Sequence, residues 1–257
     1  MEFLMRSDSK LSDAQWKAID EKVVAAARSV LTGRKFLNIY GPLGAGVPAV
    51  EIKTNGARQI AVLPELSSDF TLSWRDLETA ERLNVPMSYS DAVNAAVDTA
   101  LQEDKLVFLG DEENGYKGLL SEPGKTVKMT GWDKDENAFA AVSSGLQYML
   151  ENRTYGSKVL VVSPDLFASL QRIQAGTGTL ESTRIESLIE GKIYQTPVLP
   201  AKTALLLATD DQNMDLAIGQ DLVTAYLGSS DMNHDFRVFE TVLLRLKNPN
   251  AVVAFRG

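Results

Sequence analysis

Apolar residues recur at helical spacing near the start of the chain. Intervals of three and four residues, typical of an α-helix with one buried face, separate Trp16, Ile19, Val23, Ala27 and Val30. Ser12 and Gln15 have the spacing of a capping box, in which each side chain satisfies a backbone amide at the helix start. Gly33 predicts a left-handed helix end, because glycine has no Cβ to clash there. The pattern predicts a helix from residue 12 that buries its stripe in the core.

Residues 36–66 change to the alternating pattern of β-strands. After the run 36–40, the sequence GPLGAGVP interrupts the chain, and two more alternating runs then flank Asn55-Gly56. Asn-Gly between such runs is a strong hairpin signal, because both residues tolerate a positive φ. An isolated two-stranded hairpin is marginally stable in water, so we expect a neighbouring subunit to supply its missing contacts. The residues expected to mediate this contact are Val50, Ile52, Asn55, Gly56, Ile60 and Val62.

The rest of the chain mixes helical and strand patterns. Helices are expected at 75–83, 88–105, 134–151 and 181–190, with another starting after Ser163-Pro164. Strands are expected at 70–74, 158–163, 192–199, 204–209, 236–248 and 251–255. This order predicts an α+β fold in which a mixed insertion, residues 130–220, interrupts a discontinuous first domain.

Composition narrows the possible functions. The 257 residues carry a formal net charge of −8, which is the wrong sign for a surface that binds nucleic acid. The absence of cysteine excludes disulfides, thiolate metal sites and thiol nucleophiles, and the single histidine, His234, excludes sites that need several imidazoles. The sequence contains no run of about 18 apolar residues, so it predicts no membrane-spanning helix. The N-terminus lacks the features of a secretion signal. We therefore expect a cytoplasmic protein with no membrane or nucleic-acid partner.

No motif in the sequence predicts catalysis or metal binding. GPLGAG at 41–46 lacks the lysine of a phosphate-binding loop and leads into a strand instead of a helix. DKDEN at 133–137 and DDQNMD at 210–215 lack the glycine and glutamate of a calcium loop. The acidic cluster 111–113 is typical of a solvated loop, and no nucleophile elbow accompanies His234. We predict no catalytic residue and no metal site.

Several ordered segments together resemble the encapsulin shell proteins. They are MEFLMRSDSKLSDAQWKAID at the start, GRKFLNIYGPLG (33–44), FTLSWRDLETAER (70–82), VFLGDEENGYKGLLS (107–121), EGKIYQTPVL (190–199), IGQDLVTAY (218–226) and FETVLLRLKNPNAVVAF (239–255). The resemblance implies the tailed-phage major capsid (HK-ninety-seven-like) fold and self-assembly into a closed icosahedral shell. It further implies enclosed cargo enzymes, such as a ferritin-like protein or a dye-decolorising peroxidase, docked through C-terminal targeting peptides.

The resemblance also implies a division of the chain. Residues 1–44 would form the N-terminal helix and the start of the peripheral domain, and 45–66 the extended loop. The peripheral domain would continue over 67–129, the axial domain would span 130–220, and residues 221–257 would return to the peripheral domain.

Two candidate sites follow from this division. A cargo-peptide pocket is expected from Leu31, Arg34, Phe36, Asn38 and Tyr226, where Asn38 replaces an acidic residue common in the family. A pore loop is expected from Gln174, Gly176, Thr177, Gly178 and Thr179, whose lack of charge predicts filtering by size.

The sequence also bears on one cofactor and on two other functions. Some encapsulins bind flavin through a tryptophan after the strand resembling FTLSW; here Arg75 stands at that position and Trp74 one residue earlier, so we expect no cofactor. A phage major capsid protein that packages DNA would share the fold. A peptidase or bacteriocin is a further alternative, for which the sequence offers no catalytic residues.

Overall fold

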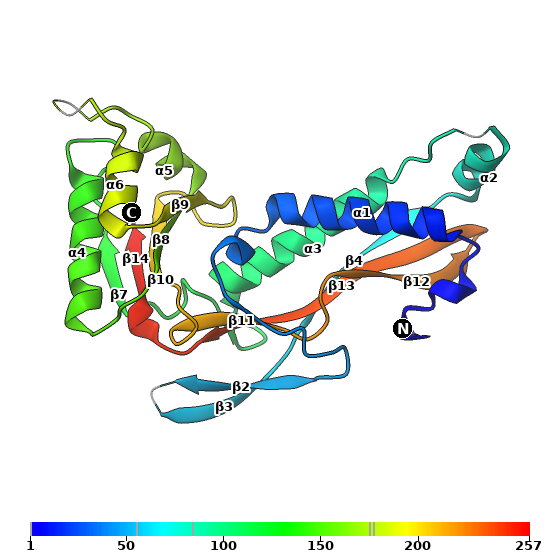
Figure 1. Cartoon of the computed structure of the whole chain (residues 1–257), viewed down its shortest axis with the longest axis horizontal. Helices are drawn as coiled ribbons and strands as arrows, with labels where there is room; N and C mark the ends of the chain where they lie inside the picture. The colour runs from blue at the N-terminus through cyan, green and yellow to red at the C-terminus, as the bar shows by residue number, and fades with distance from the viewer. Residues whose placement is uncertain (1, 55, 84, 175, 177) are drawn as a thin grey trace.

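Two modules make up the chain, each built on its own five-stranded sheet (Figure 1). The computed structural model describes residues 2–54, 56–83, 85–174, 176 and 178–257. The elongated module contains the sheet β1-β11-β13-β12, with β4 also paired to β13, the helices α1 to α3 and the hairpin β2–β3. The compact module contains the sheet β7-β14-β10-β8-β9 and the helices α4 to α6.

The elements of the elongated module come from two separate parts of the chain, residues 2–117 and 214–246. Its helices are α1 (Asp13–Val30), α2 (Trp74–Leu83) and α3 (Ser90–Phe108), with 3-10 turns η1 (Glu2–Leu4), η2 (Arg6–Asp8) and η3 (Gly33–Lys35). Its strands are β1 (Ile39–Tyr40), β2 (Ala49–Thr54), β3 (Ala57–Val62), β4 (Glu65–Leu72), β11 (Met214–Ile218), β12 (Val223–Ser230) and β13 (Asn233–Leu246). A short ladder of β5 (Gly110–Asp111) and β6 (Tyr116–Lys117) follows α3.

The compact module is formed by the middle of the chain together with its C-terminus. Its helices are α4 (Asn137–Glu151), α5 (Pro164–Ser169) and α6 (Glu181–Ile189). Its strands are β7 (Lys125–Lys128), β8 (Lys158–Val162), β9 (Lys192–Gln195), β10 (Thr203–Ala208) and β14 (Val252–Arg256), which follows the 3-10 turn η4 (Pro249–Ala251).

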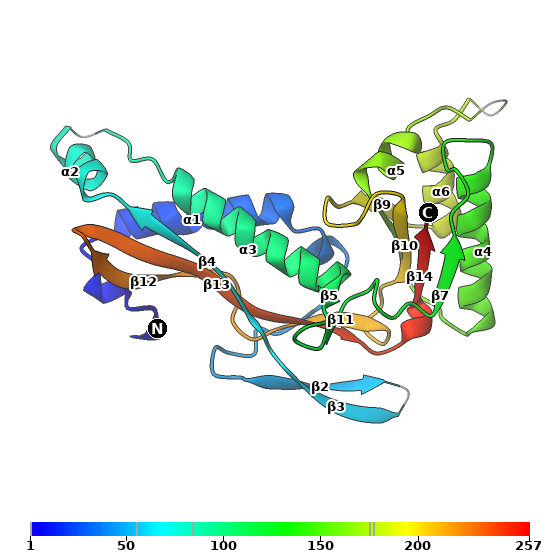
Figure 2. The same cartoon turned by 180° about the vertical axis from the view of Figure 1, so that it is seen from behind.

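Helix α1 begins with the expected capping box. The amide of Gln15 donates to Ser12 Oγ at 3.3 Å, and the amide of Ser12 donates to Gln15 Oε1 at 2.8 Å. The apolar stripe of α1 packs with α3 over one face of the long sheet, and α3 contributes small residues there, which lets the elements approach closely. Phe236 on β13 stacks with Phe70 on β4, and Figure 2 shows these two strands next to α1 and α3.

The 14-residue strand β13 is the central element of the elongated module. Its first part pairs with β12 and with β4, and its last part pairs with β11. Residues buried along it alternate with half-buried ones up to Glu240, as expected for a sheet that has one face in the core.

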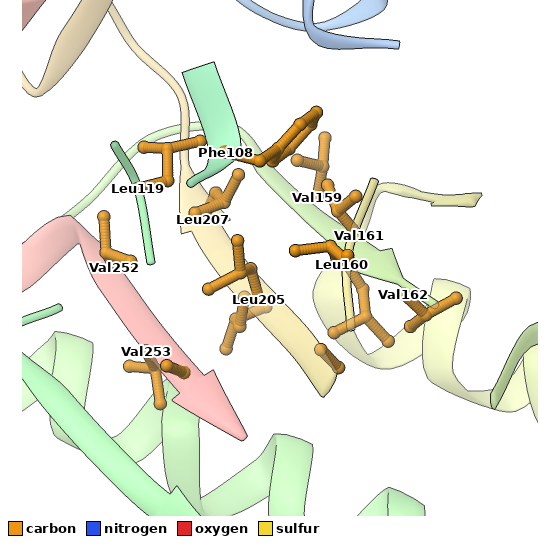
Figure 3. Close-up of a cluster of buried hydrophobic side chains, with 14 of the residues drawn as sticks. Phe108, Leu119, Val159, Leu160, Val161, Val162, Leu205, Leu207, Val252 and Val253 are labelled. Carbon is orange, nitrogen blue, oxygen red and sulfur yellow. The ribbon is translucent and has the colours of Figure 1, made fainter. Parts of the chain in front are cut away.

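The compact sheet is buried on both faces. Every residue of β10 is buried, and so are four of the five residues of β8 and of β14. Figure 3 shows the apolar cluster that results, in which Phe108, from the end of α3, packs beside Leu205 and Leu207 of β10. One apolar cluster thus joins the end of α3 in the elongated module to the compact sheet.

Three sequence-based expectations about the fold need correction. Strand β14 pairs with β10, and β7 pairs with β14, so 252–256 and 125–128 belong to the sheet of the expected 130–220 insertion and not to the first domain. Strand β11 lies within 130–220 yet pairs with β13 in the elongated module. The expected strand 36–40 is reduced to β1, because Phe36 and Leu37 both pack into the apolar cluster around Phe108.

Candidate docking groove and assembly surfaces

A groove opens beside the C-terminal end of α1. Its volume is about 370 Å³. The lining residues come from α1, η3, β1 and the β11–β12 connection: Val24, Ala27, Arg28, Leu31, Arg34, Lys35, Ile39, Asp221 and Leu222. One face of the end of α1 forms the wall, because its lining residues Val24, Ala27 and Arg28 and the C-cap residue Leu31 have the helical spacing of three and four. The exposed side chains of Arg28, Lys35 and Asp221 add charge to this largely apolar wall.

The end of α1 is held by a carboxylate from α3 and not by a left-handed glycine. Asp104 accepts hydrogen bonds from the amides of Thr32, at 2.9 Å, and Gly33, at 3.0 Å. Because these amides already have an acceptor, α1 ends at Val30, and Gly33 starts η3 with no positive φ. The prediction of a left-handed stop at Gly33 is therefore wrong. Burial raises the pKa of Asp104 to about 6, although the two amide hydrogen bonds act in the opposite direction.

Three carboxylates surround the guanidinium of Arg34. Its Nε donates to both oxygens of Glu103, at 3.0 and 2.9 Å, and its Nη2 donates to Glu103 at 2.6 Å and to Glu240 at 2.5 Å. Its Nη1 donates to Asp221 at 2.6 Å. Burial lowers the pKa of Arg34, but the hydrogen bond and charge of Glu103, with the other carboxylates, raise it above its ordinary value. Since these bonds use four of the five N–H donors of an arginine, Arg34 has one donor left for a ligand.

The structure brings only two of the five expected pocket residues to the groove, namely Leu31 and Arg34. Phe36 instead packs against Phe108 and Tyr194, with ring centroids 6.2 and 5.4 Å away. Asn38 is exposed and donates to the carbonyl of Thr209 at 3.1 Å. Neither side chain lines this groove.

Tyr226 also lies away from the groove. Its side chain is buried in the cluster around Trp16 and Phe236, and its hydroxyl is 3.1 Å from His234 Nδ1. Both residues of this pair are on the β12–β13 ladder, and Tyr226 shares its cluster with Trp16 near the start of α1. Tyr226 is therefore part of the core of the elongated module.

The sequence contained signals for the residues that were missed. Glu103 lies three residues beyond Ala100 and four before Val107 on the buried stripe of α3, and a charge in such a stripe indicates a buried ion pair. Glu240 continues the inward series of Phe236 and Val238 along β13. Both positions could have been recognised as buried acids that need a cation.

The Asn-Gly hairpin forms as predicted. The strands β2 and β3 pair from Ala49↔Val62 to Thr54↔Ala57, and Gly56 has a φ of 81° in the turn; Asn55 lies outside the described residues. Figure 2 shows the hairpin below the long sheet, reached through the segment after β1. In that segment Gly41 has a φ of 134°, and a Cβ there would lie 2.3 Å from the carbonyl oxygen of Ile218.

The two faces of the hairpin differ. Val50 is buried with Leu63, Ala217 and Leu243 of the same chain, and Ile52 packs against this cluster. On the other face Ile60 is 83% and Val62 is 59% exposed. Val50 therefore packs within its own subunit, and the Ile60 face is the more exposed one; contact of the hairpin with another subunit stays a prediction.

The expected pore loop lies at the far end of the compact module, between α5 and α6 (Figure 1). A backbone bridge joins Ile173 to Leu180, and the amide of Gln174 donates to the carbonyl of Thr179 at 3.0 Å. Gly176 and Gly178 have φ values of 80° and 66°, and Thr177 lies outside the described residues. Below the loop, Arg172 and the buried Glu181 form an ion pair at 2.7 Å.

The remaining chemistry of the described residues is limited. No group of three or more His, Cys, Asp or Glu side chains in that part of the chain could hold a metal ion. Helices long and apolar enough to cross a membrane are likewise missing from the described ranges. Trp74 starts α2, and the guanidinium of Arg75 lies 5.5 Å from the centre of its ring. The absence of flavin stays a prediction.

Known proteins resemble this chain in sequence over almost its whole length. Over residues 1–243 the chain matches the protein family described as an encapsulating protein for peroxidase. It is 37% identical to the type 1 encapsulin shell protein EncA of Myxococcus xanthus over 278 aligned residues, which cover 100% of this chain and 97% of that protein.

Two solved structures share the fold. The virus-like particle from Pyrococcus furiosus matches with a TM-score of 0.81 and 21% identity, over 94% of this chain and 99% of that one. The capsid of Myoviridae phage XM1 matches with a TM-score of 0.68 and 14% identity, over 88% and 92% of the two chains.

These findings identify the fold of the chain and the family to which it belongs. Two modules with a hairpin arm form the tailed-phage major capsid fold. The chain belongs to the encapsulin family of shell proteins. The predicted fold class and the predicted family are both confirmed.

Proposed function

We propose that this chain assembles through the Ile60 face of its hairpin into a closed shell, and that the shell holds a cargo enzyme by a peptide seated in the α1 groove. The family description, which names a peroxidase as the encapsulated protein, supports the cargo role. The single observation that carries the docking site is the groove itself, an apolar channel with charged residues at the end of α1. The phage capsid alternative is not retained, because the chain belongs to the encapsulin family.

The groove suits an extended peptide segment. Its volume of about 370 Å³ is at the lower end of the range for ligand sites, which fits a few side chains and not a folded domain. Burying one aliphatic side chain contributes roughly 1.5–3 kcal/mol, and micromolar affinity needs about 8 kcal/mol. Two or three apolar side chains of the peptide would supply this binding free energy, together with hydrogen bonds from Arg28, Lys35 or the remaining donor of Arg34.

A charge placed on the groove wall tests the docking site. Val24→Asp introduces a carboxylate among the apolar lining residues, so shells of this variant should lose their cargo. Ala25→Asp is the matched control, because Ala25 is exposed on the same helix and does not line the groove. Cargo is measured by mass spectrometry of shells purified from the native host, and shell formation by electron microscopy. Equal cargo in both variants would place the docking site elsewhere.

The exposed face of the hairpin tests the assembly role. Ile60→Lys with Val62→Lys should leave the subunit folded, because both side chains are exposed, and should prevent closed shells because the apolar contact between copies is lost. Gln59→Lys is the control on the same strand but the opposite face, where Gln59 pairs with Ile52. Light scattering and electron microscopy report assembly. Normal shells from the double variant would remove the hairpin from the proposal.

Two finer proposals concern the pore and the cargo. The segment 174–179 would line a pore that filters by size. Thr179→Asp would then slow the entry of anions into a loaded shell and spare cations; equal entry of anions and cations would contradict the pore assignment.

A haem absorption band in purified shells would indicate a peroxidase cargo, whereas bound iron without haem would indicate a ferritin-like cargo. The cytoplasmic location stays a prediction that cell fractionation would test.

A further inference from the structure

The ion cluster beneath the groove contains more acid than base. Arg34 contributes one positive charge, and Glu103, Glu240 and Asp221 contribute three carboxyl groups at distances of 2.5–2.6 Å from its nitrogens. The side chains of Glu103 and Glu240 have no exposed surface, whereas that of Asp221 is 56% exposed. An unpaired charge is too costly to bury, so such a group usually takes up a proton instead.

The hydrogen bonds show which carboxyl group lacks donors. Both oxygens of Glu103 accept hydrogen bonds from Arg34, and Asp221 accepts one from Arg34 and one from the amide of Leu222. Glu240 accepts a single bond at Oε2, and its buried Oε1 has no partner among the described residues. If Glu240 were ionised, Oε1 would be a buried anionic oxygen with no hydrogen-bond donor among the described residues.

We propose that Glu240 retains a proton at neutral pH, and that this proton makes the cluster a pH-sensitive lock between η3, α3 and β13. Burial raises the pKa of Glu240 well above its ordinary value, and the neighbouring Glu103 carboxylate acts in the same direction, against the effect of Arg34. Because Arg34 and Asp221 of the cluster also line the groove, the lock forms part of the groove wall. The lock exists whether or not the groove binds a cargo peptide.

The groups that face Glu240 come from several elements. Glu103 comes from α3, Arg34 comes from η3, and Asp221 comes from the β11–β12 connection. Its register neighbour on β4 is the apolar Leu66. Only Arg34 among these groups is a cation, so loss of the proton adds a negative charge that nothing nearby neutralises.

The direction of the pH effect follows from linkage. A carboxyl group whose pKa is raised in the folded state contributes stability that is complete below its unfolded pKa and is lost as the pH rises through its folded pKa. Alkali should therefore weaken the lock. Glu240→Gln, a neutral side chain of the same shape, should remove this contribution and still accept the hydrogen bond from Arg34.

Infrared spectroscopy tests the proton directly. At about pH 7, above the pKa of about 6 for Asp104, wild-type shells should show the C=O band of a protonated carboxyl group, and Glu240→Gln shells should lack it. Glu122→Gln is the control, because Glu122 is exposed and paired with Lys117; it should keep the band. A wild-type spectrum without the band, or the same band in the Gln variant, would overturn the proposal.

Thermal unfolding from neutral to alkaline pH tests the lock. The melting temperature of the wild type should fall more steeply with pH than that of Glu240→Gln, while Glu122→Gln follows the wild type. Failure of Glu240→Gln to fold at neutral pH would also contradict the proposal, because glutamine resembles the protonated side chain. Parallel profiles for all three proteins would show that no proton is released from the cluster.

Discussion

The two modules bury different kinds of side chain. In the compact module, β8, β10 and β14 are continuous buried runs, because helices and loops cover both faces of the sheet. In the elongated module α1 and α3 cover one face, and β13 alternates between buried and half-buried residues. Of the six buried charged side chains in the described part of the chain, Glu181 belongs to the compact module and five belong to the elongated one: Glu103, Asp104, Asp215, Glu240 and Arg245.

This difference separates two ways of holding a subunit together. The compact module depends on apolar packing, which has no preferred direction and tolerates few voids. The elongated module adds directional ion pairs that join segments far apart in the sequence, as Arg34 joins α3 to β13 and Asp215 joins β11 to Arg245. The elongated module also carries the groove and the exposed hairpin, so its ionic contacts set the positions of the surfaces that other molecules would meet.

Removing the cation of the cluster should have the largest effect. Arg34→Leu leaves the Glu103 carboxylate buried without a cation, which should lower the free energy of unfolding by about 3–5 kcal/mol. Arg237→Leu is the control, because its partners Asp69 and Glu65 are half exposed and such pairs contribute about 1 kcal/mol or less. Denaturant titration of dissociated subunits measures both. Equal losses would show that burial does not distinguish these ion pairs.

Truncating the compact core should have the next largest effect. Leu205→Ala should lower the free energy of unfolding by about 2–5 kcal/mol, because Leu205 is fully buried and its neighbours cannot collapse into the cavity. Leu150→Ala, at a position that is 55% exposed on α4, should change it by about 0.5 kcal/mol or less. The same titration checks both. A small effect of Leu205→Ala would mean that the compact module does not depend on apolar packing.

The buried acid at the end of α1 should give the elongated module an additional pH dependence. The pKa of Asp104 is about 6 in the folded state against 3.8 ordinarily, so its contribution is complete below the lower value and is lost as the pH rises through the higher one. Between pH 5 and 7 the wild type should lose about 1.4 kcal/mol more than Asp104→Asn, since one pKa unit corresponds to that amount. Denaturant titrations at the two pH values measure this. Parallel pH profiles would contradict the assignment.

Replacing the residue before a helix should give the smallest difference in the free energy of unfolding between the two modules. Ser12→Ala removes the capping box of α1 and should lower the free energy of unfolding by about 1 kcal/mol. The residue before α4, Glu136, makes no capping bond with its side chain, so Glu136→Ala should have a smaller effect, limited to its partly exposed pair with Arg184. Thermal unfolding of the two variants gives the comparison. A larger loss of stability in Glu136→Ala than in Ser12→Ala would contradict this prediction.

Local features of the structure were predictable from the sequence. The capping box at Ser12, the Asn-Gly hairpin and the buried strand at 158–163 depend on residues a few positions apart, and their hydrogen bonds or periodicity are visible in the sequence. The resemblance that identified the family rested on longer segments in order, and it predicted the fold class correctly.

Contacts between distant segments were decided by the tertiary structure. The end of α1 was predicted from Gly33, but the carboxylate that ends it, Asp104, lies 71 residues further along the chain. The pocket was predicted from neighbouring residues, but Phe36 turns into the core because Phe108 and Tyr194 complete an apolar cluster there.

The sequence by itself determined the elements and the family, because periodicity, caps and turns are local properties of the chain. The tertiary structure alone decided which charges are buried and which surfaces stay open. Arg34, Glu103, Asp221 and Glu240 meet only after η3, α3, the β11–β12 connection and β13 have packed together. Hydrogen bonds and burial between such distant segments depend on the fold of the whole chain, so the groove and its buried proton site could be found only in the folded molecule.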